Sequence, residues 1–311
     1  DFTATLGAGL RTYCPLGAEL TFAGYALPEY VGWQELADRR RINGRYGAGL
    51  FGNFGRTGLE ATAARTDDSL FFSRELEVPV NTRLDRGAAQ LEFELFGGLS
   101  LFAGGELRRI RYLDKDDPTL ATLDLLDRDE EILRAGLRFP LFGGLEIGVG
   151  AEDSRVTFDT TERDRSNHGL SPILQVDFKG SGLRLTSNLA WRDLEPEPGS
   201  AFVPYRNVTG DFRLEVRIGG QLRPELYGRR NLVYALEQQW VYFDDTGLGL
   251  GLRTSLGPIA SLRLFVEEGT NEFTSFAGVS DRQDDYRAIG GQLRFALGRF
   301  ALILGASSTT Y

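Results

Sequence analysis

Residues Val208 to Leu226 read VTGDFRLEVRIGGQLRPEL, and the first half of this stretch contains two alternating kinds of residue. Valine, glycine, phenylalanine, leucine and isoleucine occupy the even positions from 208 to 218, whereas threonine, aspartate, arginine and glutamate occupy the odd positions. Successive side chains of a β-strand point to opposite faces of the sheet. The alternation therefore predicts a strand with one apolar and one charged face, then a turn at Gly219-Gly220 and a second strand.

Alternation of this kind is a property of the whole chain. Apolar residues occupy every second position from Leu174 to Phe178, before a turn at Gly180. After the turn, apolar residues of one parity recur from Leu183 to Trp191. No stretch approaches the roughly 18 consecutive apolar residues of a transmembrane helix, and the spacing of an amphipathic helix is hard to find. The 39 glycines suit tight turns better than long helices. The sequence therefore predicts an all-β protein.

Short glycine turns recur about every 40 residues along the chain. Each interval has room for one strand outward, a polar connection and one strand back, because a membrane-crossing strand takes about 9 to 11 residues. Eight such turns join sixteen strands in a single domain that covers residues 1–311. The turns are marked by Gly17, Gly55, Gly97, Gly143, Gly180, Gly219, Gly257 and Gly298.

Charged segments lie between these turns, and we interpret them as loops because polar clusters of this kind commonly separate regular elements. They comprise residues 114–118, 127–131, 160–167, 193–198 and 281–285. The expected meander therefore has short turns at one end and long charged loops at the other.

Three all-β architectures compete for this pattern. A soluble sandwich alternates because two sheets pack face to face, but it seldom sustains so long an up-and-down meander, and a propeller repeats four strands per blade. A membrane barrel explains both faces, since lipid contacts the apolar one and water or packed polar groups contact the charged one. We expect a transmembrane antiparallel up-and-down β-barrel of about 16 strands, wide enough for a channel, in the outer membrane of a Gram-negative-type bacterium.

The parity also assigns side chains to the two faces of the barrel wall. The residues expected to line the lumen are Gln175, Asp177, Arg184, Arg192, Arg213, Glu215, Arg217, Arg253, Arg263, Glu267, Gln292 and Arg294. The residues expected to face lipid are Leu174, Val176, Phe178, Leu183, Leu185, Leu189, Trp191, Phe212, Leu214, Val216 and Ile218. Inward charges of both signs suit neutral or zwitterionic solutes better than one kind of ion. In a second interpretation, they pair across neighbouring strands and stiffen the wall.

Composition and motifs limit the partners and the chemistry. The formal charge of −9 disfavours nucleic acid, whose phosphates require a basic surface, so outer-membrane lipid is the expected partner. His168 is the single histidine and lies near Ser166 and Ser171, but nothing else marks a hydrolase site. The acidic segments lack the spacing of a calcium-binding loop. We expect no enzyme activity, cofactor or metal, and we assign no role to Cys14.

The turn count constrains both ends of the chain. The first expected strand runs from Phe2 to Leu10 toward a short turn, and the last runs from Phe300 to Tyr311 away from one. Both termini then lie at the long-loop rim, although complete barrels normally end in the periplasm, beside the short turns. We therefore expect one strand to be missing at each end of an intact barrel of about 18 strands. The alternative is a sixteen-strand barrel with both ends outside.

The last segment, DRQDDYRAIGGQLRFALGRFALILGASSTTY (281–311), joins an Asp/Arg-rich stretch to a returning strand, a glycine turn and a strand ending in small polar residues. Segment 128–159 has a similar layout. Both resemble the outer-membrane beta-barrel porin 2 family, whose members are associated with exopolysaccharide export loci. The resemblance implies an outer-membrane pore and carries no residue roles.

Three functions remain open. The first, which the resemblance favours, is a pore for export of a polymer such as exopolysaccharide, with other envelope-complex subunits as partners. The second is a general diffusion porin for small solutes, and the third is a structural barrel whose loops bind a partner. A TonB-dependent receptor is not expected, because no plug-sized segment precedes the first strand.

Overall fold

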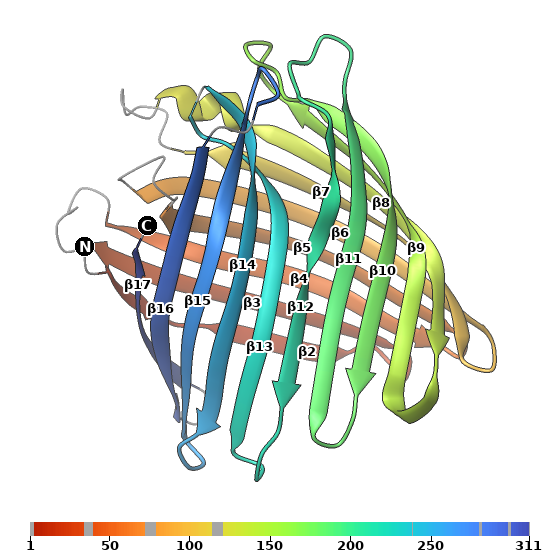
Figure 1. Cartoon of the computed structure of the whole chain (residues 1–311). Coiled ribbons are helices and arrows are strands. Elements are labelled where there is room, and N and C mark those ends of the chain that lie inside the picture. The colour runs from red at the N-terminus through yellow and green to blue at the C-terminus, as the bar shows by residue number, and fades with distance from the viewer. Residues whose placement is uncertain are drawn as a thin grey trace.

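The computed structural model describes residues 3–33, 40–71, 79–113, 121–237, 239–279, 282–297 and 300–310, most of which lie in long antiparallel strands (Figure 1). The strands are β1 (Thr3–Gly7), β2 (Leu10–Pro15), β3 (Leu20–Trp33), β4 (Arg41–Phe54), β5 (Thr57–Phe71), β6 (Pro79–Phe96), β7 (Leu99–Tyr112), β8 (Arg128–Pro140), β9 (Leu145–Phe158), β10 (Asn167–Lys179), β11 (Leu183–Pro196), β12 (Tyr205–Val216), β13 (Leu222–Tyr234), β14 (Trp240–Ser255), β15 (Ala260–Ser275), β16 (Arg282–Leu297) and β17 (Phe300–Thr310). Two short 3-10 helices also occur in these residues, η2 (Ala121–Leu126) and η3 (Phe142–Gly144). None of the described helices is long and apolar enough to cross a membrane.

β1 and β2 are one strand that is interrupted at residues 8–9. Both pair with β3 in a single register, with Thr3 opposite Trp33 and Leu10 opposite Ala26. From β3 onward each strand pairs antiparallel with the next along the chain. The described strands therefore form the expected up-and-down meander of sixteen strands, and the predicted barrel fold is confirmed.

The first and last strands lie beside each other, with β1 against β17, and the barrel is nearly closed. One missing strand at each end would leave a gap two strands wide between them, and the described residues of β1 and β17 lie too close together for such a gap. The start of β1 and the end of β17 lie on the same side of the barrel (Figure 1). They belong to the rim that carries the longer connections, as the turn count predicted.

The short turns form where the glycines predicted them. Positive φ, which residues with a side chain rarely adopt, is found at Gly17, Gly55, Gly97, Gly143, Gly219 and Gly257. At Gly180 the backbone N–H donates instead to the carbonyl of Leu183, at 2.8 Å. The remaining marker, Gly298, lies outside the described residues, between the ends of β16 and β17.

Three of the charged segments interpreted as loops belong largely to strands, so that interpretation is wrong for them. They are segments 127–131, 193–198 and 281–285, since β8 begins at Arg128, β11 continues to Pro196 and β16 begins at Arg282. The physical reason is strand length. β8 has 13 residues and β14 has 16, which is more than the roughly 9 to 11 that cross a bilayer. The charged ends of the strands therefore extend beyond the apolar band.

The other two charged segments have different outcomes. Segment 160–167 connects β9 to β10 as expected, up to the first residue of β10. Segment 114–118 lies outside the described residues.

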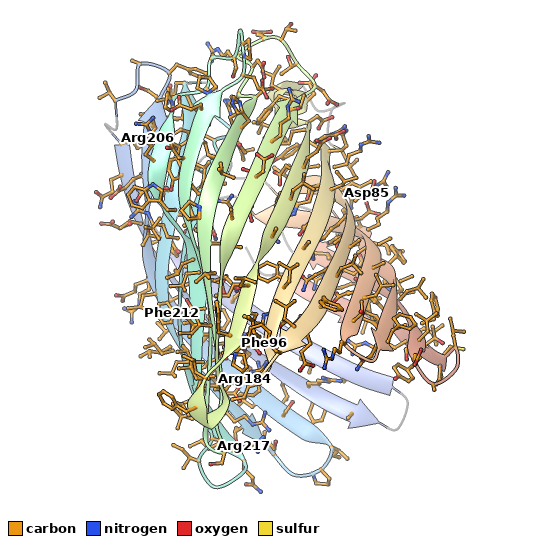
Figure 2. The ribbon with its side chains drawn as sticks, turned by 90° about the vertical axis from the view of Figure 1, so that its right-hand side faces the viewer. Asp85, Phe96, Arg184, Arg206, Phe212 and Arg217 are labelled. Carbon is orange, nitrogen blue, oxygen red and sulfur yellow. The ribbon has the colours of Figure 1, made fainter. Side chains whose placement is uncertain are left out.

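Charged side chains on the outer surface form ion pairs with one another near the end of the barrel that carries the long connections. Arg65 Nε lies 2.5 Å from Asp85 Oδ1, and Arg206 Nε lies 2.8 Å from Asp193 Oδ1. Figure 2 shows Asp85 and Arg206 toward this end of the strands and Arg217 at the short-turn end. These exposed pairs mark the level at which the outer surface changes from apolar to charged.

Candidate functional site in the barrel interior

The ladders place the two predicted sets of side chains on opposite faces of the sheet. Arg184 lies opposite Glu215, whereas Leu185 lies opposite Leu214. The face that carries Arg184 and Glu215 is the interior one. One cavity is lined mainly by side chains of the corresponding face of strands from β2 to β10, and Gln175 is among them. Contact of the other face with lipid stays a prediction.

Half of the predicted lumen residues contact charged side chains that lie on other strands and outside the predicted set. These contacts are Arg192–Glu152, Arg213–Glu225, Arg263–Glu225, Glu215–Arg223, Glu267–Arg229 and Gln175–Arg138. Asp177 pairs with Lys179 of its own strand, at 3.8 Å. Within the described part of the chain, no ion pair involves Arg184, Arg217, Arg253 or Arg294, and Gln292 lies opposite Arg263.

A row of ion pairs, built around two buried carboxylates, crosses the interior wall from β6 to β11. Arg86 Nε donates to Glu106 at 2.6 Å, and Arg134 lies 3.7 Å from the same carboxylate. Arg134 and Arg192 both donate to Glu152. The side chains of Glu106 and Glu152 are only 4% and 3% exposed. Carboxylates at this depth are tolerated because several arginines bond each one. We call these five residues the buried ion-pair chain.

A second network occupies the wall from β13 to β16. Glu225 accepts hydrogen bonds from Arg263 Nη2 at 2.9 Å, although β14 lies between their strands. Arg229 bonds both Glu267, at 2.7 Å, and Asp245, at 2.8 Å. Many interior charges therefore pair with one another across strands, in agreement with the second interpretation of the inward charges.

Glycines on β14 provide the space for this network. The stretch TGLGLGLR (246–253) lies within β14, and its glycines share the interior face. A Cβ on Gly249 would lie 2.3 Å from the Tyr227 ring, and one on Gly251 would lie 2.4 Å from Glu225 Cγ. Large side chains of β13 therefore lie across the glycine positions of β14.

We expect Gly249→Ala to lower the free energy of unfolding by about 1–3 kcal/mol, because the Tyr227 ring must move to admit the new methyl group. Gly87→Ala is the matched control, since a Cβ there meets nothing within 4 Å. Urea unfolding of the barrel in lipid vesicles measures both. Equal stability of the two variants would contradict the packing of Tyr227 on Gly249.

A hydrophobic cluster packs inside the long-connection end of the barrel. It includes Val80 on β6 and Val241 on β14, strands that are eight positions apart in a ring of sixteen. η2 contributes Leu123 and Leu126, each 1% exposed. The other members are Tyr112, Phe158, Leu194, Phe202, Tyr205, Tyr234, Leu236 and Tyr242. We call this set the mouth cluster. It fills the half of the barrel mouth that is bordered by strands β6 to β14.

Polar side chains tie the mouth cluster to the wall. Asn167 Nδ2 donates to the hydroxyl of Tyr234 at 2.7 Å, which links β10 to β13. The hydroxyl of Tyr205 donates to Asp244 at 2.6 Å. Because these polar groups are buried and bonded, they add geometric specificity to the packing of the mouth.

The interior is hollow on the other side of the buried ion-pair chain. A cavity of about 670 Å³ lies among β2 to β8 and β10, and its lining includes Tyr13, Tyr25, Phe51 and Phe102. Tyr13 is 73% exposed and lies two residues before the end of β2. The cavity therefore reaches water near the short-turn rim. We call it the vestibule.

The remaining sequence candidates do not form a catalytic or metal site among the described residues. His168 Nδ1 lies 3.6 Å from Glu197, whereas the Ser166 hydroxyl donates to Asp164. No group of three or more metal-ligating side chains was found in the described ranges. Cys14 is a free, exposed cysteine. The absence of enzyme activity stays a prediction.

No protein-family model and no curated protein matches the chain. Solved structures of similar fold include the ferric preacinetobactin receptor BauA from Acinetobacter baumannii (12% identity, TM-score 0.50) and the apoprotein form of the FrpB iron transporter from Neisseria meningitidis (9%, 0.50). The siderophore receptor PirA from Acinetobacter baumannii is also similar (9%, 0.50).

These matches cover 99% of this chain but only 61–62% of the other chains. The chain thus spans less than two thirds of their length. At such low identity the likeness concerns the fold alone. The chain has the fold of an outer-membrane β-barrel, and this fold places it in the outer membrane.

Proposed function

We propose that the barrel is a gated outer-membrane passage for export of a polymer such as exopolysaccharide. The observation that carries the proposal is the asymmetry of the interior. The vestibule lies toward the short-turn rim, whereas the mouth cluster packs the opposite end. Bacterial barrels usually place short turns in the periplasm. A substrate can therefore enter from the periplasm while much of the outer mouth is closed, as controlled export requires.

The chemistry of the interior supports a polar substrate with apolar faces. Paired arginines and carboxylates give a polar wall without the single-sign ring of an ion filter. Aromatic side chains such as Tyr25 and Phe51 add apolar surface to the vestibule. Sugar rings combine hydroxyl groups at their edges with apolar C–H faces, so both kinds of surface can contact them.

A general diffusion porin is the alternative, and the water-accessible vestibule is the observation in its favour. A porin, however, needs a continuous aqueous path across the membrane. The mouth cluster obstructs such a path between β6 and β14. The similar solved structures are receptors and a transporter for iron or iron carriers, and we transfer no ligand from them at 9–12% identity.

Single-channel recording in planar bilayers tests the proposal. We expect the unaltered barrel to remain mostly closed, because the mouth cluster is packed. The double variant Leu123→Asp, Leu126→Asp introduces two carboxylates where both side chains are 1% exposed, so it should loosen the cluster and produce larger, longer openings. Phe142→Asp is the control, because Phe142 is 82% exposed at a short turn.

The three functional classes predict different single-channel currents. A large steady current from the unaltered barrel identifies a diffusion porin. Silence from both the unaltered barrel and the double variant, with the barrel folded, identifies a structural role. Openings confined to the double variant support a gated passage.

A further inference from the structure

One wall of the vestibule is built from small side chains. Gly49, Thr62 and Ala88 lie opposite one another in a row across β4, β5 and β6. In the adjacent row, Arg11 on β2 and Arg86 on β6 stand at the two ends. Because neighbouring strands lie about 4.8 Å apart, these ends are separated by roughly 19 Å along the wall. This wall therefore forms a floor of small side chains with an arginine at each side.

Aromatic rings lie on this floor. The Tyr25 ring covers Gly47, where a Cβ would come within 2.7 Å of it, and the Phe51 ring covers Gly49 at 2.9 Å. Both residues are 39% exposed, so a substantial part of each ring faces the open vestibule. Rings held against glycine lose little conformational freedom when a ligand stacks on them. They provide two fixed apolar platforms.

The charges of the vestibule are distributed unevenly. Glu106 is shared by Arg86, Arg108 and Arg134, of which Arg108 also pairs with Glu130 and Arg134 with Glu152, so these arginines are already compensated by carboxylates. No carboxylate among the described residues pairs with Arg11. Glu60 also lines the vestibule, but it lies four residues from the row of Arg11 and Arg86, about 13 Å along β5.

From this arrangement we infer that the vestibule is a binding site for an acidic glycan, a chain of sugar rings that carry carboxylate groups. The sugar rings stack on Tyr25 and Phe51, and a sugar carboxylate accepts hydrogen bonds from Arg11, since Arg86 already donates twice to Glu106. Hydroxyl groups of the next ring reach Glu60. The inference rests on the proposed export function for its biological meaning, and it names the class of polymer.

Calorimetric titration of the purified barrel in detergent tests the site with two probes, a hexamer of galacturonic acid and the neutral maltohexaose. We expect the acidic hexamer to bind about tenfold more tightly than the neutral one, because a charge-assisted hydrogen bond is lost without the carboxylate. Arg11→Gln should remove this difference. Tyr25→Ala should weaken binding of both probes about tenfold, since it removes a stacking platform.

Two controls keep the test specific. Tyr227→Ala removes another ring that lies across a glycine, and Arg253→Gln removes another interior arginine, both outside the vestibule lining. Neither should change binding. Equal affinity for both hexamers, no binding of either one, or full affinity in the Tyr25→Ala variant would each overturn the inference. Conductance is a separate measurement, so a barrel that opens but binds no acidic hexamer overturns the site and leaves the passage intact.

Discussion

Arginine in place of Leu214 should destabilise the barrel in a bilayer by about 2–4 kcal/mol, the cost of an arginine on the lipid face near the membrane midplane. Leu214 lies within the apolar parity of β12 and opposite Leu185 and Leu226 on the two neighbouring strands. No acidic side chain stands beside it in these ladders. The new guanidinium therefore has to remain in the hydrocarbon or distort the bilayer to reach water.

Asn188→Arg is the matched control on the interior face. Asn188 is exposed and lies opposite Asp211, so the new guanidinium can pair with a carboxylate in water, and we expect a change within about 1 kcal/mol. Unfolding by urea in lipid vesicles compares the two variants. Equal loss of stability would sink the assignment of the apolar parity to lipid.

Thr209 is unsuitable as a mild interior position, although parity alone suggests it. Thr209 is only 7% exposed, and its hydroxyl accepts a hydrogen bond from Arg192 Nε at 3.2 Å. An arginine there would meet packed side chains and a like charge. Parity thus identifies the face of a residue, but it does not distinguish a hollow part of the interior from a filled one.

The fold was predictable because two local signals agree. Glycines such as Gly55 and Gly219 adopt positive φ in the turns, and the residue types between turns alternate with the period of a strand. Strand ends were harder to predict. Beyond the bilayer both faces of a strand meet polar groups, so Arg128 to Glu131 reads like a loop although β8 already begins at Arg128.

The interior contacts were not predictable from parity, because they depend on which strands curve toward one another. Arg192 and Glu152 are 40 residues apart, and β10 lies between their strands. Only the register of two successive ladders brings them together. The mouth cluster was equally hard to predict. It brings together residues that are distant in the sequence, and members such as Val80 and Leu123 look like ordinary strand or loop residues there. An available signal for the ion pairs was the recurrence of inward arginines and glutamates on β6 to β9.

Removing one buried carboxylate should have the largest effect on the interior. We expect Glu152→Gln to destabilise the barrel by about 1.5–3 kcal/mol, because the buried acceptor then loses the negative charge to which both Arg134 and Arg192 donate. The side chain of Glu152 is 3% exposed, whereas those of Arg134 and Arg192 are 36% and 22% exposed, so water reaches the two arginines but hardly the carboxylate. Glutamine has nearly the same shape, and the change therefore reports on charge rather than on a cavity.

Asp85→Asn is the matched control for this variant. Asp85 also pairs with an arginine of a neighbouring strand, Arg65, but the two side chains are 34% and 50% exposed. Solvent screens such a pair, and its loss should cost about 1 kcal/mol or less. Unfolding in vesicles at low and high salt separates the cases, since salt weakens the exposed pair and leaves the buried one nearly unchanged. A Glu152→Gln barrel as stable as the Asp85→Asn barrel would mean that the buried ion-pair chain contributes no more to stability than the outer surface pairs, and that the interior wall is held by its backbone ladders alone.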